Sequence, residues 1–270
     1  MSTARSTPPS RTTNVLEQLL AGSLEDALAR RELRSSAQVE AEALARVPAL
    51  DALSALAPAD HMKVIAEVKR ASPSRGHLAE IAEPQTLAAQ YEAGGASAVS
   101  VLTEERKFKG SLADLEAVRK AVSIPVLRKD FIGDEYQVLE ARAAGADLVL
   151  LIVAALPQER LDTLHTMIRE LGMTPLVEAH SADEVARAVD LGAQLVGVNA
   201  RDLRTFELDR DLFGRVADQI PAGVIRVAES AVLNVADVEH YREAGADVVL
   251  VGEALVTSDP VATLKSYLSV

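Results

Sequence analysis

The sequence predicts an α/β protein: a closed (β/α)8 barrel, the TIM barrel fold, preceded by an N-terminal helical extension. Eight short apolar segments recur along residues 64–251, and amphipathic stretches with helical periodicity separate them. Their spacing of roughly 20 to 35 residues suits one strand, one helix and two short loops. The chain has 270 residues, of which 49 % are apolar, and barrels of about 250 residues commonly form one domain.

The candidate strands are 64–69, 98–102, 125–129, 148–153, 175–178, 195–199, 224–229 and 248–251. Gly-Ala pairs that begin at Gly95, Gly145, Gly192 and Gly245 each end a helix before every second strand. A closed barrel explains both the count of eight and this period of two units. A doubly wound open sheet has no reason to stop at eight strands.

Three segments make up the predicted domain organisation. Residues 1–13 are rich in Ser, Thr, Arg and Pro and are expected to form a disordered tail. Residues 14–62 are expected to form the helical extension, with Asn14 and Glu17 as a capping box and Ser36 as the cap of a second helix. The expected inner faces are Leu16, Leu19, Leu20, Leu24 and Leu28 in the first helix, and Val39, Leu44 and Val47 in the second. Residues 63–270 are expected to form the barrel domain, and we expect the extension to close over one of its ends.

Composition narrows the setting and the partners. The chain contains no Cys, which excludes a disulfide framework and a thiolate nucleophile and favours a reducing, cytoplasmic location. A net charge of −12 disfavours nucleic acid and anionic membranes as partners. No apolar run reaches the length of about 20 residues that a membrane span needs. We expect a monomer that binds a small molecule, with an oligomer left open.

Polar side chains gather at the predicted strand ends. In a barrel the active site lies where strands end and the following loops begin. Strands one, three, five, six and seven end in Glu67 and Lys69, Lys129, Glu178, Asn199, and Glu229 with Ser230. Strand four ends in apolar residues, which suits either an apolar wall for a hydrophobic substrate group or ordinary barrel packing. We therefore predict one shared site, although each polar residue alone fits a solvated rim position, and Glu67 with Lys69 fits a plain ion pair.

The charges at these ends indicate acid–base chemistry. Nearby carboxylates favour the protonated form of a lysine, and a partly desolvated glutamate retains basicity. No His stands at a strand end, so neither a zinc cluster nor a Ser-His-Asp triad is predicted there. The five histidines are interpreted as structural or surface residues: His61, His77, His165, His180 and His240. A lysine Schiff base remains open, although the surrounding glutamates argue against it.

A phosphate site is the second predicted feature. Gly252 follows the last strand and opens a short stretch that fits the extra helix whose N-terminal amides bind phosphate in many barrels. Ser230 and Ala231 supply the loop after strand seven. Ser72, Arg201 and the Glu253 amide complete the expected set. A simple turn after the last strand is the alternative.

Over residues 64–270 the chain resembles the indole-3-glycerol phosphate synthase family. The resemblance rests on AEVKRASPSRG, SVLTEERKFKGS, PVLRKDFIGDEYQ, GADLVLLIVAAL, LVEAHS, GVNARDL, VAES and LVGEAL, in this order. It implies a carboxy-lyase of tryptophan biosynthesis that uses no metal or cofactor. The implied reaction converts 1-(2-carboxyphenylamino)-1-deoxyribulose 5-phosphate to indole-3-glycerol phosphate, with release of CO2 and water.

The resemblance also implies roles for single residues. Lys129 would be the general acid that protonates the substrate carbonyl, and Glu67, Lys69 and Glu178 would handle the later proton transfers. Around the substrate amine and sugar hydroxyls it places Asn199, Glu229 and Ser230. At the phosphate it places Ser72, Arg201, Gly252 and the Glu253 amide. Near the anthranilate ring it places the loop aromatics Phe108 and Phe131.

Two departures and two alternatives accompany the resemblance. The segment DALSALAPADH before strand one lacks the aromatic-containing motif that the family often has there. The family usually has Gly after Glu-Ser, where this chain has Ala231, and glycine there lets an amide approach the phosphate closely. A phosphoribosylanthranilate isomerase would use the same phosphate site, but it needs a Cys and Asp pair, and the chain has no Cys. A non-catalytic phosphate-binding barrel is the other alternative, and the presence of all the charged positions argues against it.

Overall fold

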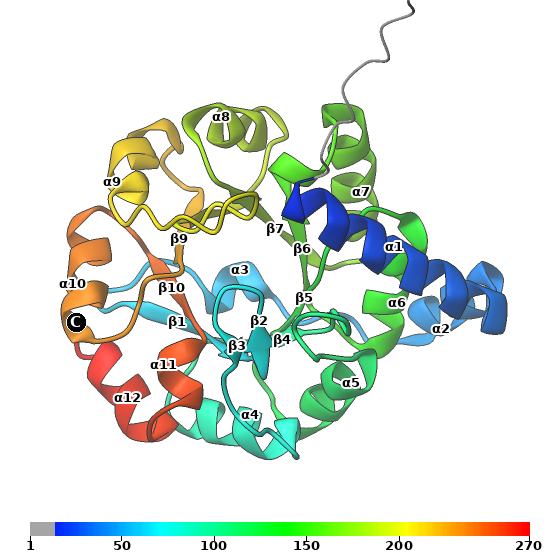
Figure 1. Ribbon diagram of the computed structural model, residues 1–270, viewed down its shortest axis with the longest axis horizontal. Helices are drawn as coiled ribbons and strands as arrows, with labels where there is room; N and C mark the ends of the chain where they lie inside the picture. Colours follow the sequence, from blue (N-terminus) through cyan, green and yellow to red (C-terminus); the bar gives the residue numbers. More distant parts are fainter. Residues whose placement is uncertain (1–13) are drawn as a thin grey trace, which may run out of the picture.

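The barrel is closed, as the sequence predicts. The computed structural model describes residues 14–270, so the predicted disordered tail lies outside the described residues. Eight parallel strands close into a ring in the order β1-β10-β9-β8-β7-β6-β5-β4. Figure 1 shows the ring viewed close to its axis, with most of the helices around its outside. This arrangement brings all eight strand ends to one mouth.

The barrel strands are β1 Lys63–Val68, β4 Ala98–Leu102, β5 Val126–Lys129, β6 Leu148–Ile152, β7 Thr174–Ala179, β8 Leu195–Asn199, β9 Ile225–Glu229 and β10 Val248–Val251. Three match the predicted ranges, and the other five differ by one residue at one end or at both ends. A small antiparallel hairpin, β2 Ala71–Ser72 and β3 Gly76–His77, follows β1 and stands over the mouth. This hairpin carries the predicted phosphate ligand Ser72.

The helices of the barrel are α4 Pro84–Ala93, α5 Leu112–Ala121, α6 Glu135–Ala144, α7 Gln158–Glu170, α8 Ala182–Asp190, α9 Leu212–Val216, α10 Val235–Glu243, α11 Glu253–Val256 and α12 Pro260–Tyr267. Two short 3-10 turns, η1 Val153–Ala155 and η2 Ala217–Gln219, complete the set. The four glycines of the Gly-Ala pairs all have left-handed φ angles, between 74° and 97°. They end helices where only a residue without Cβ is unstrained, which is why the repeat is visible in the sequence.

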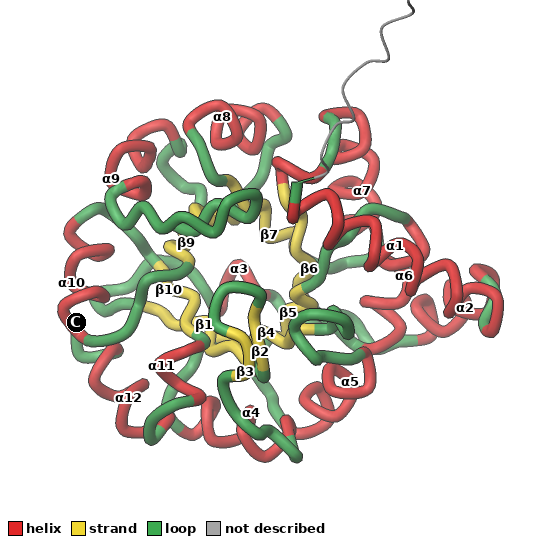
Figure 2. The backbone as a smooth tube through the Cα atoms, in the orientation of Figure 1, coloured by secondary structure: helices red, strands yellow, loops and turns green. Residues whose placement is uncertain are grey.

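The N-terminal extension contributes to the barrel in two places. It consists of α1 Val15–Leu33, α2 Ser36–Ala45 and α3 Ala52–Ala55. Residues Ala52 and Leu56, in and just after α3, pack against the apolar side chains inside the barrel, and α3 lies at the centre of the ring in Figure 2. Leu53 shares a small cavity with Thr174 and Gln194, which stand at or just before the starts of β7 and β8, so α3 closes the amino end. Helices α1 and α2 instead pack along α6 (Figure 1).

Of the two helix caps predicted in the N-terminal extension, the first is confirmed and the second is wrong by one residue. Asn14 caps α1 through the predicted capping box with Glu17. The cap of α2 is Ser35 rather than Ser36, because Gln38 stands three residues after Ser35 and completes a second capping box.

The inner faces of both helices are also narrower than predicted. Leu16 and Leu19 are buried, whereas Leu28 is exposed. In α2 the buried residues are Val39 and Ala43, whereas Leu44 is 68 % exposed. Val47 lies beyond the end of α2 at Ala45 and is 80 % exposed. The small Ala43 allows a close approach to α6 and turns Leu44 outward. Among residues 14–270, no helix combines the length and apolar character needed to cross a membrane.

Candidate active site

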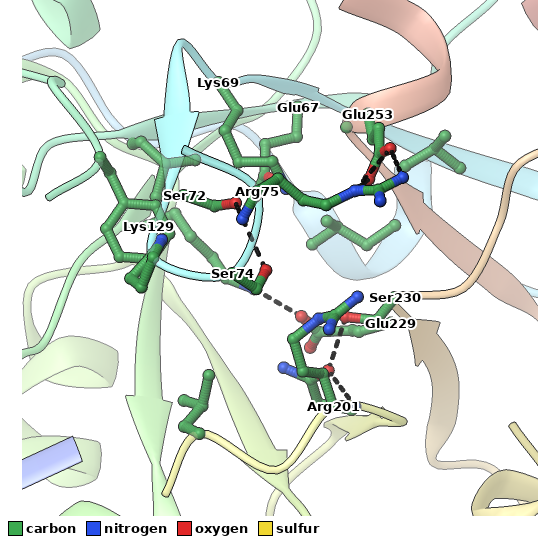
Figure 3. A pocket seen from close by; sticks show the side chains of 18 of the residues that line it. Glu67, Lys69, Ser72, Ser74, Arg75, Lys129, Arg201, Glu229, Ser230 and Glu253 are labelled. Carbon is green, nitrogen blue, oxygen red and sulfur yellow. Dashed lines mark hydrogen bonds and ion pairs between the residues drawn. The ribbon is translucent and has the colours of Figure 1, made fainter. Parts of the chain in front are cut away.

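A cavity of about 450 Å³ opens at the carboxyl ends of the strands. Every residue that the sequence analysis proposed for the site lines it: Glu67, Lys69, Ser72, Phe108, Lys129, Phe131, Glu178, Asn199, Arg201, Glu229, Ser230, Ala231, Gly252 and Glu253. Figure 3 shows labelled members of this set converging on one space from β1, β5, β9 and the loops above them. The residues proposed from the sequence therefore lie around one shared cavity, as predicted.

Lys129 lies at the centre of a charged cluster inside the mouth. Its Nζ donates to Glu178 Oε2 at 3.0 Å and to Glu229 Oε2 at 2.5 Å. Both glutamate side chains are 1 % exposed, and Lys129 is 13 % exposed. Asn199 Nδ2 donates to Glu178 Oε1 at 3.2 Å, and Ser230 Oγ donates to Asn199 Oδ1 at 2.8 Å. Four strand ends thus fix one lysine between two buried carboxylates.

The charges and burial of this cluster determine which of its groups carries a proton. Burial alone would lower the pKa of Lys129, but the charges of Glu178 and Glu229 outweigh burial and raise it. Burial and the charge of Glu178 raise the pKa of Glu229 to about 8. Burial would also raise the pKa of Glu178, but the charge of Lys129 and contact with His180 hold that pKa well below its usual range. The cluster therefore contains a protonated lysine, an ionised glutamate and a second glutamate that keeps a proton near neutral pH.

A second lysine forms a simpler pair beside the first. Lys69 Nζ lies 2.7 Å from Glu67 Oε1, and Ser100 Oγ donates to Glu67 Oε2 at 3.3 Å. Gly252 of the neighbouring β10 end packs directly against this pair. A Cβ at that position would lie 2.7 Å from Glu67 Oε1 and 2.9 Å from Lys69 Nζ, so any side chain there would displace the pair.

The predicted phosphate ligands surround one edge of the cavity. Gly252 stands at the start of α11, with Glu253 as its first residue. Ser230 and Ala231 have left-handed φ angles of 70° and 57°. Ala231 thus adopts the backbone conformation that a glycine would take, at a cost that glycine would not incur. Arg75, at the tip of the β2–β3 hairpin, donates through Nε to Glu253 Oε1 at 3.0 Å (Figure 3).

Arg201 lines the cavity, and among residues 14–270 its guanidinium group has no carboxylate partner. Its Nη1 donates to the Phe206 carbonyl at 3.2 Å, and its backbone N–H donates to Asn199 Oδ1 at 3.0 Å. Within residues 14–270 the other lining cations all pair with carboxylates, and Arg201 does not. It is therefore the group best placed to receive an anionic part of a ligand.

An apolar wall faces the charged cluster. The side chains of Leu150 and Ile152, two residues apart on β6, line the cavity. Strand β6 is the fourth predicted strand, and of its two interpretations the structure favours the apolar wall. Phe108 and Phe131 stand beside it with ring centroids 6.0 Å apart. The Glu104 carboxylate accepts the backbone N–H groups of residues 106, 107 and 108 at 2.7 to 3.0 Å and so orders the loop that carries Phe108. These side chains offer an apolar surface against which an aromatic ring can pack.

The N-terminal helix is fastened to this mouth through Asp130. Ser23 of α1 donates its Oγ proton to Asp130 Oδ1 at 2.9 Å, across 107 residues of sequence. Thr103 Oγ1 and Arg128 Nη2 donate to Asp130 Oδ2 at 2.6 and 3.1 Å. Asp130 stands between Lys129 and Phe131, so this buried network holds the loop after β5 in place.

Three residues with a role in the geometry were missed by sequence reasoning. Arg75 pairs with Glu253, and its signal was the charged residue in the Ser-Pro-Ser-Arg-Gly turn. Gly197 of β8 packs against Glu229, where a Cβ would lie 2.1 Å from Oε1. His180 was interpreted as structural or surface, but its Nε2 lies 3.1 Å from Glu178 Oε1. Among the described residues, no group of three or more His, Asp or Glu side chains is arranged to hold a metal ion.

Comparison with known proteins places the chain in a family. The family model described as indole-3-glycerol phosphate synthase matches residues 16–266. An indole-3-glycerol phosphate synthase of Leifsonia xyli is 72 % identical over 254 residues, covering 94 % of this chain and 98 % of the relative. One of Rhodococcus opacus is 57 % identical and covers 91 % of each chain. Among solved structures, a thiamine phosphate pyrophosphorylase from Pyrococcus furiosus matches with a TM-score of 0.57 at 14 % identity, over 76 % of this chain and 93 % of that one. That last likeness concerns the fold alone.

Proposed function

The chain belongs to the indole-3-glycerol phosphate synthase family, and we propose how the side chains of its barrel mouth divide the work of that family's reaction. The reaction closes the five-membered ring of indole from a carboxyphenylamino-deoxyribulose phosphate. A ring carbon attacks the sugar carbonyl carbon, CO2 leaves, and then water leaves. Every step moves a proton or a charge, so acids and bases in fixed positions are the catalytic requirement.

Lys129 is assigned to ring closure, and its position between two buried carboxylates is the observation that carries the assignment. As the carbon–carbon bond forms, negative charge develops on the carbonyl oxygen. Glu178 and Glu229 keep the lysine protonated, so it can donate a proton to that oxygen. Loss of CO2 from the same ring carbon then restores the aromatic ring.

The remaining carboxylates and Lys69 are assigned to dehydration. The new hydroxyl leaves as water from the former carbonyl carbon, and the neighbouring carbon loses a proton. These two events need one acid and one base near the same bond. Glu67 with Lys69 and Glu178 with Glu229 supply such groups on adjoining strand ends. Asn199 and Ser230 orient Glu178 through their hydrogen-bond chain.

The rest of the cavity is assigned to binding. Phe108, Phe131, Leu150 and Ile152 offer the apolar surface for the anthranilate ring. The phosphate is placed at the opposite edge, against Ser72, Ala231 and the first amides of α11, with Arg201 available to an anionic group. A long substrate held at both ends leaves its reacting carbons over Lys129.

We also propose that the protein acts as a monomer in the cytoplasm. The absence of Cys from the whole chain suits a reducing compartment. A sedimentation experiment at micromolar concentration measures the mass, and a dimer would correct the first part of this proposal.

The direct test supplies carboxyphenylamino-deoxyribulose phosphate and follows indole absorbance and fluorescence. Phosphoribosylanthranilate is offered in parallel, because an isomerase with the same phosphate site would consume that compound instead. We expect turnover of the first compound only. The rate should survive exhaustive chelation with EDTA, since each proton transfer is assigned to a side chain. A rate that disappears with EDTA and returns with a divalent ion would overturn the residue roles given above.

A further inference from the structure

His180 lies directly behind the charged cluster and outside the cavity. It follows β7, and its side chain is only 2 % exposed. Nε2 lies 3.1 Å from Glu178 Oε1, and Nδ1 lies 3.2 Å from Glu184 Oε2, in the first turn of α8. The same Glu184 oxygen accepts the backbone N–H of His180 at 2.7 Å. Carboxylate oxygens thus lie close to both ring nitrogens, but within residues 14–270 only Nδ1 has a hydrogen-bond partner, and Nε2 meets Glu178 as an ion pair by distance alone. Two carboxylates at this distance favour the doubly protonated, charged ring.

Glu178 and Glu229 differ in what surrounds them. Glu178 accepts hydrogen bonds from Asn199 at Oε1 and from Lys129 at Oε2, and His180 Nε2 lies 3.1 Å from Oε1 as an ion-pair contact. Glu229 meets Lys129 through Oε2, but its Oε1 is buried without a hydrogen-bond partner among the described residues. A carboxylate with both oxygens hydrogen-bonded and a histidine ring beside it is stabilised in its charged form more than one with an unpartnered oxygen.

We propose that His180 is a positioning residue of the active site, which turns Glu178 Oε2 toward Lys129 and keeps Glu178 ionised, so that the proton shared by the two glutamates resides on Glu229. The inference rests on the proposed function and deepens it. Glu178 then serves as the base and Glu229 as the acid among these carboxylates. His180 itself does not touch the substrate.

The other charges near His180 come from three elements. Glu178 belongs to β7 and Glu184 to α8, while Asp202 and Arg204 come from the loop after β8 and pair with each other at 3.0 Å. Burial lowers the pKa of His180, but its two glutamate contacts outweigh burial and raise the pKa to about 9. The doubly protonated ring that the two neighbouring carboxylates favour is therefore the stable form at neutral pH.

The first experiment observes the ring directly and does not depend on activity. Protein labelled with nitrogen-15 in its five histidines is titrated by NMR, and His180 is assigned from the signal that His180→Gln removes. We expect imidazolium shifts for His180 at pH 7 and titration near pH 9. A neutral His180 ring at pH 7 would overturn the proposal, even in a protein with no detectable turnover.

The second experiment compares pH profiles of kcat/KM, which report the free enzyme. His180→Gln keeps a neutral donor toward Glu178 but removes the charge, so the pKa of Glu178 should rise and that of Glu229 should fall. The acidic limb should move to higher pH and the alkaline limb to lower pH. We expect kcat/KM to fall about tenfold more at pH 6 than at the new optimum, with KM changed less than about threefold.

Two further variants separate this role from packing. His165→Gln removes another buried histidine, from α7 and remote from the cavity, and should leave the shape of the profile unchanged. Glu184→Gln keeps the shape of the contact to His180 but removes a negative charge, so the pKa of His180 should fall. In the pH profile of kcat/KM, only the alkaline limb should then fall. An equal loss at every pH in His180→Gln, matched by His165→Gln, would show that His180 only packs. If wild type does not turn over the substrate, the proposed function fails, while the NMR result still decides the state of His180.

Discussion

Two lysines line the same mouth, and their surroundings differ in one charge. Lys69 has a single carboxylate partner, Glu67, at 2.7 Å. Lys129 has two, Glu178 at 3.0 Å and Glu229 at 2.5 Å. The first pair is neutral as it stands, whereas the second cluster carries one excess negative charge if both carboxylates are ionised. Such a buried excess favours uptake of a proton.

The difference gives the Lys129 cluster one more carboxylate than the pair of Lys69 and Glu67. With the pKa of Glu229 raised to about 8 by burial and by Glu178, the Lys129 cluster holds a transferable proton besides that of the lysine itself. The pair of Lys69 and Glu67 can exchange one proton only between its own members or with a ligand. Each cluster is also packed against a glycine: Gly197 behind Glu229, and Gly252 beside Lys69.

The largest expected effect is that of Lys129→Met. Methionine keeps much of the stem volume and removes both the proton and the charge, so folding and phosphate binding should persist. General acid catalysis is typically worth about 10²- to 10⁴-fold, and kcat should fall within or beyond that range, with a much smaller change in KM. Steady-state kinetics with the carboxyphenylamino-deoxyribulose phosphate measure both constants.

Two further variants test whether Lys129 or Lys69 is the acid of ring closure. Lys129→Arg should restore little, because a guanidinium is too weak an acid and differs in shape. If Lys129→Met turned over within about threefold of wild type while Lys69→Met were inactive, Lys69 would be the acid of ring closure and the two clusters would exchange roles.

The next effect comes from Gly197→Ala. The new Cβ would lie 2.1 Å from Glu229 Oε1, so this carboxylate has to move away from its contact with Lys129. Because the displaced group is the end of a side chain, the fold should survive. A misplacement of about 1 Å costs on the order of 10²-fold in rate, and kcat should fall by about that factor. Circular dichroism and thermal melting serve as the control, and an unchanged kcat would show that the position of Glu229 is unimportant.

A smaller effect is expected for Gly252→Ala. Its Cβ would meet Glu67 Oε1 at 2.7 Å and Lys69 Nζ at 2.9 Å, but Lys69 is 20 % exposed and has room to move toward the cavity. The residue also begins α11, so the phosphate contact moves with it. We expect a fall of about tenfold in kcat/KM, shared between kcat and KM. A loss as large as that of Gly197→Ala would remove the distinction between the clusters.

The sequence predicted the barrel and the lining of its mouth because both follow from local patterns. Short continuous apolar runs mark buried parallel strands, and a closed barrel brings the ends of these strands together. Glu67, Lys129 and Glu178 could therefore be grouped without knowing any distance. The capping box at Asn14 is similarly local, since it lies within four residues.

The missed features depend on a neighbour distant in sequence in one case, and in the others on local contacts that the pattern alone does not single out. Gly197 is special because the Glu229 side chain of the next strand crosses its Cα, and nothing near Gly197 in the sequence records this. His180 touches Glu178 two residues earlier, but the second carboxylate comes from α8 and depends on how that helix begins. Ser35 and Ser36 are both good caps, and only Gln38 distinguishes them.

The smallest effect is expected at Ala231, on the phosphate edge and away from both lysines. Its φ of 57° is a left-handed conformation that costs an L-residue roughly 1–2 kcal/mol and glycine almost nothing. Ala231→Gly relieves that strain but adds about 0.4–1 kcal/mol of chain entropy to the unfolded state, so the melting temperature should rise only slightly. The phosphate is held similarly in ground and transition states, so a closer amide should lower KM by a few-fold and leave kcat nearly unchanged. Ser230 has the same backbone conformation, but its hydroxyl donates to Asn199, so Ser230→Gly should lower kcat instead. If Ala231→Gly reduced kcat about tenfold at constant KM, this loop would belong to the catalytic cluster rather than to the phosphate site.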